Sequence, residues 1–279
     1  MTPDRASAAR ELLTFYAEAG VDALVGEMPA DRLASAQGEA TIAETTPAPE
    51  RPPLQRLQPA APARPPLAAA PGAPAVPELA VMAAREAARS AASLDALRDM
   101  LTKFEGCALR TTAKQLVFAD GNPQARVMFV GEAPGREEDL EGLPFVGRSG
   151  KLLDLMMAAI GLDRTGAYIA NIIPWRPPGN RTPTPQESQI CLPFIQRQIE
   201  LVNPDILVCM GNPATQTLLG VKEGIKRTRG RWFGFHTGTR EIRAIATYHP
   251  AYLLRSPLDK RFAWRDFLAI KKALDAPPA

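Results

Sequence analysis

The residues of this sequence that can do chemistry gather in three short segments, and each follows a run of apolar residues. The first begins at Gly131 and Glu132, continues through further acids that include Glu138, and reaches Phe145 inside a glycine-rich stretch. An isolated acidic loop is usually a solvated turn. Here an aromatic ring lies close in sequence to the carboxylates, so the segment can offer a stacking surface beside a negative charge.

The second segment starts at Asn171 and runs through a proline-rich stretch to Asn180 and Arg181. A side-chain amide offers an acceptor and two donors, which can pair at once with a donor and an acceptor on the edge of a nucleobase. Asn171 is equally compatible with a turn-forming role. The rigid, basic stretch that follows it is suited to contact a phosphate.

The third segment contains His249, one of only two histidines in the chain, followed by Leu253, Leu254 and Arg255. A histidine donor at this place can stabilise negative charge on a leaving group. A lone histidine is more often structural. The functional interpretation therefore depends on whether the fold brings this segment to the other two.

Strands and helices alternate along the part of the chain that carries these segments. Apolar runs at 126–130, 167–173, 206–210 and 242–247 predict strands, and the stretches between and after them predict helices at 151–160, 184–201, 212–219 and 260–274. This alternation indicates an α/β fold with a doubly wound, mainly parallel sheet. Ligands of such sheets bind beyond the carboxyl ends of the strands, which is where the three segments begin.

A proline- and alanine-rich stretch divides the chain. Residues 35–77 are expected to be a disordered linker because they contain few large apolar side chains to offset the entropy of ordering. Before it, residues 1–34 include a predicted amphipathic helix. After it, we expect a lead-in helix at 78–103 and a catalytic domain at 104–279.

Composition and charge narrow the class of protein. The chain has 279 residues, three cysteines and a net charge of +3. No run approaches the roughly 18 apolar residues that a membrane helix needs, and the N-terminus does not resemble a signal peptide. We therefore expect a cytoplasmic protein without a membrane partner. Residues 1–100 are acidic and residues 101–279 are basic, which is compatible with binding of a phosphate backbone.

Four motifs give the sequence a family resemblance. GEAPG with Glu132, GLPFVGRSGKLLD, NIIPWRPPGNRTPTPQE and YHPAYLLR resemble, in order and spacing, the motifs of family 4 uracil-DNA glycosylases over residues 104–274. The resemblance implies a three-layer α/β/α fold with a central four-stranded, mainly parallel sheet. It also implies hydrolysis of the N-glycosidic bond of deoxyuridine in DNA, which leaves an abasic site for base excision repair.

The resemblance implies roles for individual residues. Phe145 would stack on the flipped uracil, Asn171 would read its edge, and His249 would hydrogen-bond O2 of the departing base. Glu132, with Glu138 as the second candidate, would position the water and offset positive charge on the sugar.

Other positions complete the implied binding site. Gly131 and Ala133 would contact the substrate, and Ala133 stands where the related family 1 enzymes have their water-activating aspartate. The identity of the water-orienting group therefore stays open. The residues expected to contact DNA are Arg148, Asn180, Arg181, Leu253, Leu254 and Arg255, with Leu253 or Leu254 filling the vacated stack.

The cysteines depart from the family pattern. Family 4 enzymes hold an iron–sulfur cluster with four cysteines, whereas only Cys107 and Cys191 match those positions and Phe104 and Trp175 occupy the other two. Cys209 lies within a predicted buried strand. On ligand count we expect no metal site and no iron–sulfur cluster, so no cofactor.

Two alternative functions stay open at this point. The chain could be a glycosylase for a wider set of deaminated bases, or a non-catalytic sensor of uracil or abasic DNA. Some members of the superfamily that the chain resembles trap the sugar covalently with a histidine in an inserted loop. We do not expect this route, because the sequence between Gly179 and Thr184 has neither the insertion nor a histidine. We expect a monomer that acts on single- or double-stranded DNA, with an N-terminal segment able to tether a protein partner.

Overall fold

The computed structural model describes residues 76–276, so the segment expected at 1–34 and nearly all of the linker expected at 35–77 lie outside the described residues. Within the described range, no helix is long and apolar enough to cross a membrane. The elements in chain order are α2 (Val76–Ser90), α3 (Leu94–Lys103), α4 (Leu109–Thr112), β1 (Asp120–Gly121), β2 (Val127–Gly131), α5 (Arg136–Glu141), α6 (Arg148–Ala158), β3 (Tyr168–Asn171), η2 (Pro178–Asn180), α7 (Pro185–Val202), β4 (Ile206–Met210), α8 (Asn212–Leu219), α9 (Ile225–Thr228), β5 (Trp232–His236), β6 (Glu241–Thr247), α10 (Pro250–Arg255), η3 (Pro257–Asp259) and α11 (Lys260–Asp275).

Four parallel strands form the centre of a six-stranded sheet with the order β1-β3-β2-β4-β6-β5. Strand β2 pairs in parallel with β3 and β4, and β4 pairs in parallel with β6. The edge strands β1 and β5 are antiparallel to their neighbours. The predicted α/β fold with a mainly parallel four-stranded centre is confirmed, and the two edge strands extend it. Strand β1 has only 2 residues, which is too short to give an alternating pattern.

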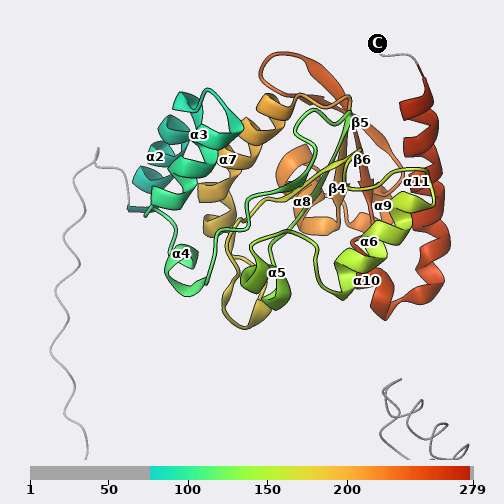
Figure 1. Cartoon of the computed structure of the whole chain (residues 1–279), viewed down its shortest axis with the longest axis horizontal. Helices are drawn as coiled ribbons and strands as arrows, with labels where there is room; N and C mark the ends of the chain where they lie inside the picture. Colours follow the sequence, from blue (N-terminus) through green and yellow to red (C-terminus); the bar gives the residue numbers. More distant parts are fainter. Residues whose placement is uncertain (1–75, 277–279) are drawn as a thin grey trace, which may run out of the picture. The chain divides into compact units, whose positions relative to one another are not determined.

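Helices cover both faces of this sheet (Figure 1). Successive side chains of a strand point to opposite faces. Met128 and Val130 of β2 therefore enter a core shared with α2, α3, α7 and α8, and Val127 and Phe129 enter a core shared with α6 and α11. The fold is thus the expected α/β/α arrangement of three layers.

Residues 78–103 form two helices, α2 and α3, where the sequence analysis expects a single lead-in helix. The break occurs before Ser93, whose side chain caps α3 by accepting from the Ala96 N–H at 3.1 Å. Arg197 of α7 donates to the carbonyl of Ala91 in the connection, through Nε at 3.0 Å and Nη2 at 2.7 Å. Both helices therefore pack onto α7 as part of the same core.

Helix α7 begins with the capping box that the sequence predicts. Thr184 Oγ1 accepts from the Glu187 N–H at 3.2 Å, and Glu187 Oε2 accepts from the Thr184 N–H at 2.7 Å. Pro185 occupies the first helical position. This start of the helix anchors the end of the long loop that follows β3.

Candidate active site

The carboxyl ends of the parallel strands place the three chemical segments around one cavity. Gly131, at the end of β2, lies opposite Asn171, at the end of β3. Met210, at the end of β4, lies opposite Thr247, at the end of β6. A cavity of about 560 Å³ opens at this edge, and its lining includes Glu132, Ala133, Phe145, Asn171, Asn212 and His249. The topology therefore brings together segments that are more than one hundred residues apart in sequence.

Phe145 forms a wall of this cavity and has an unusual backbone. Its φ is +56°, in the left-handed region, and its side chain is 4% exposed. A left-handed backbone costs a residue other than glycine roughly 1–2 kcal/mol. The ring centroid lies 5.4 Å from that of the His249 ring, with 32° between the planes. Strain of this kind persists only where the surroundings hold the residue, which points to a positional requirement for the ring.

Gly131 permits the close approach of Phe145 and Asn171. A Cβ atom at position 131 would lie 2.5 Å from Asn171 Oδ1 and 2.6 Å from Phe145 Cζ. Both distances are shorter than real side chains allow, so glycine is required here by space. The ring and the amide are consequently packed side by side at the end of β2 and β3.

Asn171 and Glu132 each present an oxygen atom that has no hydrogen-bond partner in the described part of the chain. These atoms, Asn171 Oδ1 and Glu132 Oε1, are buried. Burial raises the pKa of the Glu132 carboxyl above its usual range. Buried polar atoms are nearly always hydrogen-bonded in proteins. The two acceptors are therefore available to a ligand that enters the cavity.

His249 is held as a neutral donor. It caps α10, and its Nδ1 accepts from the Ala251 N–H at 3.1 Å. In a neutral ring the proton then resides on Nε2. Burial, with a smaller contribution from the charge of Arg255, lowers the pKa of His249 to about 4. At neutral pH the imidazole can therefore offer one N–H to an acceptor in the cavity.

Glu138 has a bracing position, although the sequence analysis names it as the second candidate for water positioning. Its Oε2 accepts from the Gly135 N–H and its Oε1 accepts from the Gly147 N–H, both at 3.0 Å. The residue is 7% exposed. With both carboxylate oxygens bound to backbone N–H groups, Glu138 ties the two ends of its loop together, and Glu132 is the acid with a free oxygen.

The residues expected to contact DNA lie at a rim beside this cavity. Arg148, Leu254 and Arg255 are exposed and line an adjoining cavity of about 500 Å³, and Asn180 and Arg255 belong to the lining of both cavities. Leu253, in contrast, is fully buried. Of the two leucines proposed to fill the vacated stack, only Leu254 can reach DNA, because Leu253 points into the core.

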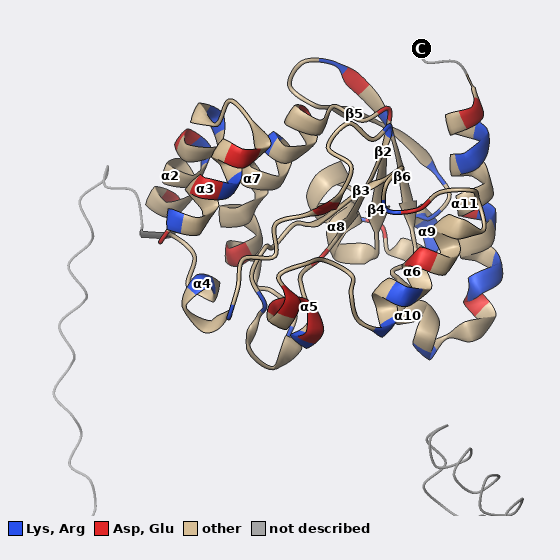
Figure 2. Ribbon diagram, in the orientation of Figure 1, with Lys and Arg blue, Asp and Glu red and all other residues tan. Residues whose placement is uncertain are grey.

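In the loop after β3, the basic side chains already have partners within the protein. Arg181 makes a bidentate ion pair with Glu187, at 2.9 and 2.7 Å. Arg176 Nε donates to Asn180 Oδ1 at 2.6 Å. Figure 2 shows basic residues along α11 and a concentration of acidic residues on α5. The unpaired cations near the cavity therefore come from α6 and α10 more than from this loop.

The sequence analysis misses two residues that the structure places at the site. Asn212 lines the cavity, and its Oδ1 is buried without a partner in the described residues. Its position directly after Gly211 at the end of β4 is the signal that could have revealed it. Arg164 contacts the backbone of Phe145 from the loop between α6 and β3. No sequence pattern marks Arg164.

The cysteines at the two family positions lie together. Cys191 Sγ is 4.0 Å from Cys107 Sγ, and both thiols are buried. Phe104 packs edge-on against Phe194 with 4.9 Å between the ring centroids, and Trp175 is 2% exposed. Among the described residues, no group of three or more His, Cys, Asp or Glu could hold a metal ion.

Comparisons with known proteins agree with the geometry. The model of the Uracil DNA glycosylase superfamily matches residues 118–268. The type-4 uracil-DNA glycosylase of Archaeoglobus fulgidus is 41% identical over 169 residues, which are 59% of this chain and 85% of that protein. The type-4 uracil-DNA glycosylase of Saccharolobus solfataricus is 38% identical, over 67% of this chain and 88% of that protein. The type-4 enzyme of Thermotoga maritima is 40% identical, over 58% and 84%.

These relatives correct the expectation that no iron–sulfur cluster is present. Five similar proteins bear the name type-4 uracil-DNA glycosylase, and enzymes of this type carry an iron–sulfur cluster. Counting ligands from one sequence is therefore not a sufficient basis for that expectation. The side chains at the family positions supply two thiols, from Cys107 and Cys191, whereas a cubane takes four protein ligands. The residues present do not make up that ligand set, and we assign no step of the reaction to a cluster.

The matched region contains the sheet, Phe145, Asn171 and His249. It covers more than half of the 279 residues, and the relatives are matched over most of their own length. The chain belongs to the uracil-DNA glycosylase superfamily.

Proposed function

We propose that this chain is a monofunctional uracil-DNA glycosylase that hydrolyses the N-glycosidic bond of deoxyuridine in DNA and leaves an abasic site. The observation that supports this most is the composition of the cavity of about 560 Å³ at the carboxyl ends of the strands. It combines an aromatic wall, a buried amide and carboxylate with free oxygens, and a neutral histidine donor. A base must leave the helical stack to reach such a cavity.

Base recognition in this proposal uses Phe145 and Asn171. The flipped uracil stacks on the Phe145 ring. This ring lies beside Asn171 because Gly131 has no side chain that would occupy the space. Asn171 Oδ1 accepts from uracil N3–H, and its Nδ2 donates to O4. Cytosine presents a donor at the position of O4 and no N3–H, so the same amide orientation rejects it.

Bond cleavage in this proposal rests on fixed charges and dipoles. As the bond from C1′ to N1 breaks, its electron pair moves onto the base, and His249 Nε2–H donates to the negative charge on O2. The carboxylate of Glu132 offsets positive charge on the sugar and accepts a hydrogen bond from the water that attacks C1′. Both groups are already in place before DNA binds, so little reorganisation is needed.

The rim supplies the DNA contacts. Leu254 fills the space that the base has left, and Arg148 and Arg255 contact phosphates on either side. We propose, on composition, that the chain acts in the cytoplasm as a monomer and that its N-terminal segment tethers a protein partner. The boundaries at residues 34, 77 and 103 belong to the same proposal.

A cleavage assay tests the activity. A duplex oligonucleotide with one deoxyuridine is incubated with the full chain and then with hot alkali, which cuts at an abasic site. We expect a cut at that position, and the same on single-stranded substrate. No cut with stoichiometric enzyme would favour a non-catalytic sensor. Substrates with hypoxanthine, xanthine or thymine test for a broader range, and cutting of these at a comparable rate would contradict uracil specificity.

A further inference from the structure

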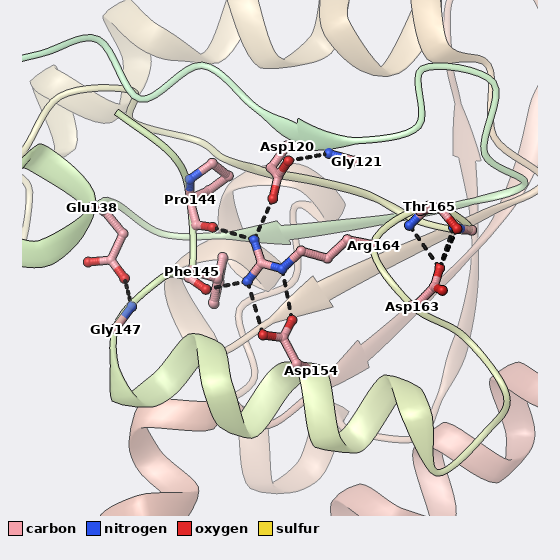
Figure 3. Close-up of polar contacts among 11 residues, drawn as sticks. Asp120, Gly121, Glu138, Pro144, Phe145, Gly147, Asp154, Asp163, Arg164 and Thr165 are labelled. Carbon is pink, nitrogen blue, oxygen red and sulfur yellow. Dashed lines mark hydrogen bonds and ion pairs between the residues drawn. The ribbon is translucent and has the colours of Figure 1, made fainter. Parts of the chain in front are cut away.

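Arg164 lies behind the wall of the base pocket, and all of its donors are used (Figure 3). Its Nη1 donates to Pro144 O at 3.1 Å, and its Nη2 donates to Phe145 O. The remaining N–H groups bind two carboxylates: Asp120 Oδ2 at 2.6 Å, and Asp154 through Nε at 2.9 Å and Nη2 at 3.4 Å. One guanidinium therefore joins β1, α6 and the loop that carries Phe145.

The two carbonyls that Arg164 binds belong to the peptide groups on either side of Phe145. Fixing both peptide planes fixes φ and ψ of the residue between them. This is the residue whose φ is +56°, a conformation that is disfavoured without outside support. Gly150 completes the cradle, because a Cβ atom there would lie 1.6 Å from Phe145 O.

The chemistry of the clamp requires arginine. A guanidinium is planar and offers five N–H groups in a fixed fork, whereas a lysine ammonium has three donors and no fixed plane. The side chains of Asp120 and Asp154 are 27% and 44% exposed, and that of Arg164 is 25% exposed. The two acids orient the guanidinium, and its remaining N–H groups hold the loop.

We propose that Arg164 is a positioning residue for catalysis, which acts by holding the Phe145 ring where the flipped base stacks. This inference rests on the proposed role of Phe145. Arg164 itself does not line the cavity, so it acts only through the backbone that it binds.

A double-mutant cycle tests the proposal in the full chain. Arg164→Lys is expected to lower kcat/KM for deoxyuridine in duplex DNA by about ten- to one-hundred-fold, since a displacement near 1 Å can cost that much. In a Phe145→Ala background, the same substitution is expected to cost less than about threefold, because the ring that it positions is gone. Asp154→Asn, which loosens the clamp from its exposed side, should cause a smaller loss of the same kind.

Arg197 provides a matched control. It also binds a backbone carbonyl through Nε and Nη2 and pairs with an acid, Glu200, and its side chain is 22% exposed. Unlike Phe145, the residue whose carbonyl it binds, Ala91, does not line the cavity. Arg197→Lys should keep full activity. Unchanged activity of Arg164→Lys, or an undiminished loss in the Phe145→Ala background, would overturn the proposal. Failure of the wild-type chain to cut would instead reject the proposed function.

A second inference comes from a different observation, the buried oxygens. Three side-chain oxygens are buried without partners in the described residues, and all three residues line the same cavity: Glu132, Asn171 and Asn212. Uracil N3–H would take Asn171 Oδ1. Glu132 and Asn212 follow the carboxyl ends of the neighbouring parallel strands β2 and β4, and both line the cavity. Two unpartnered acceptors in one cavity match one molecule with two donors.

We infer that Glu132 Oε1 and Asn212 Oδ1 together hold the attacking water. The water donates one hydrogen bond to each, which leaves a lone pair for C1′. In the reaction the water oxygen bonds to C1′, the electron pair of the C1′–N1 bond leaves with the base, and the proton passes to the Glu132 carboxylate. Asn212 thereby supplies an acceptor in the region where Ala133 has none.

Kinetics and stability together test the role of Asn212. Asn212→Ala is expected to lower kcat about ten- to one-hundred-fold with little change in KM, and to keep or raise Tm, since it removes an unpartnered buried acceptor. Asn122→Ala, at a turn where Asn122 Oδ1 accepts from the Gln124 N–H, is the control and should keep full activity. Wild-type kcat in Asn212→Ala, or an effect on KM alone, would overturn the inference.

Discussion

The cavity that we propose as the base pocket, with Phe145, Asn171 and His249, and the rim that we propose contacts DNA, with Arg148, Leu254 and Arg255, differ in how firmly their residues are held. In the pocket, Phe145 is clamped through its backbone by Arg164, and His249 is fixed by the Ala251 N–H. At the rim, Leu254 and Arg255 are exposed, and no ion pair of the described residues involves Arg148 or Arg255. The contrast indicates that the proposed pocket is preorganised for one base. The proposed rim, in contrast, has side chains that are free to adjust to the DNA phosphate backbone, which varies little with base sequence.

The largest expected effect concerns base recognition. Asn171→Ala should lower kcat/KM for deoxyuridine by an amount equivalent to roughly 2–4 kcal/mol of transition-state binding. The reason is that the base loses its hydrogen bonds to the side-chain amide. The measurement is single-turnover cleavage together with affinity for abasic DNA, which should hardly change. Unchanged cleavage would remove Asn171 from the pocket, and equal losses in both assays would erase the distinction between pocket and rim.

Substitutions of Glu138 and Glu132, two acids of the same loop, should have different effects: the first should lower stability and the second should lower activity. Glu138→Gln is expected to lower the free energy of unfolding by roughly 1–3 kcal/mol, since an amide cannot accept from both Gly135 and Gly147 N–H groups. Glu132→Gln is expected to leave Tm nearly unchanged and to slow cleavage. Denaturant unfolding and cleavage rates of the two variants check this. The reverse pattern would assign the catalytic role to Glu138.

The pH dependence of stability should reveal the buried histidine. Burial lowers the pKa of His249 in the folded chain from its ordinary 6.5 to about 4. Between pH 4 and pH 6.5 the unfolded chain therefore binds a proton at this residue that the folded chain does not bind. The stability contributed by the neutral ring is present above pH 6.5 and is lost as pH falls toward 4.

Replacement of His249 by Gln should flatten this dependence of Tm on pH, and the same replacement at His236, on β5 outside the cavity, is the matched control. An identical slope for wild type and His249→Gln would show that the ring titrates normally.

The smallest expected effect is at the rim. Arg255→Ala should weaken DNA binding several-fold at moderate salt and reduce the dependence of log K on log[salt] by about 0.9, which is the value for one phosphate contact. Cleavage at saturating DNA should stay close to wild type. Binding titrations over a range of salt concentrations measure this, and a large fall in the cleavage rate would show that Arg255 also acts inside the pocket.

Periodicity and turn chemistry were sufficient for much of the fold. The apolar runs predicted the four parallel strands, and Thr184 with Pro185 predicted the start of α7. Edge strand β1 and the break at Ser93 were missed, because two residues show no alternation and a short polar break resembles a helix surface. The cysteine count led to a wrong expectation about the iron–sulfur cluster. Counting the ligands in one sequence takes no account of the related type-4 enzymes, which carry the cluster.

The sequence by itself determined which strand ends carry Glu132, Asn171 and His249, because side-chain type and position after an apolar run are local properties. Only the tertiary structure decided what each polar atom contacts. Glu138 and Glu132 look alike in sequence, yet one binds two backbone N–H groups and the other keeps a free oxygen. Arg164 reaches Phe145 from nineteen residues away along the chain. Hydrogen bonds of this kind depend on distances set by packing of the whole fold, which no local pattern encodes.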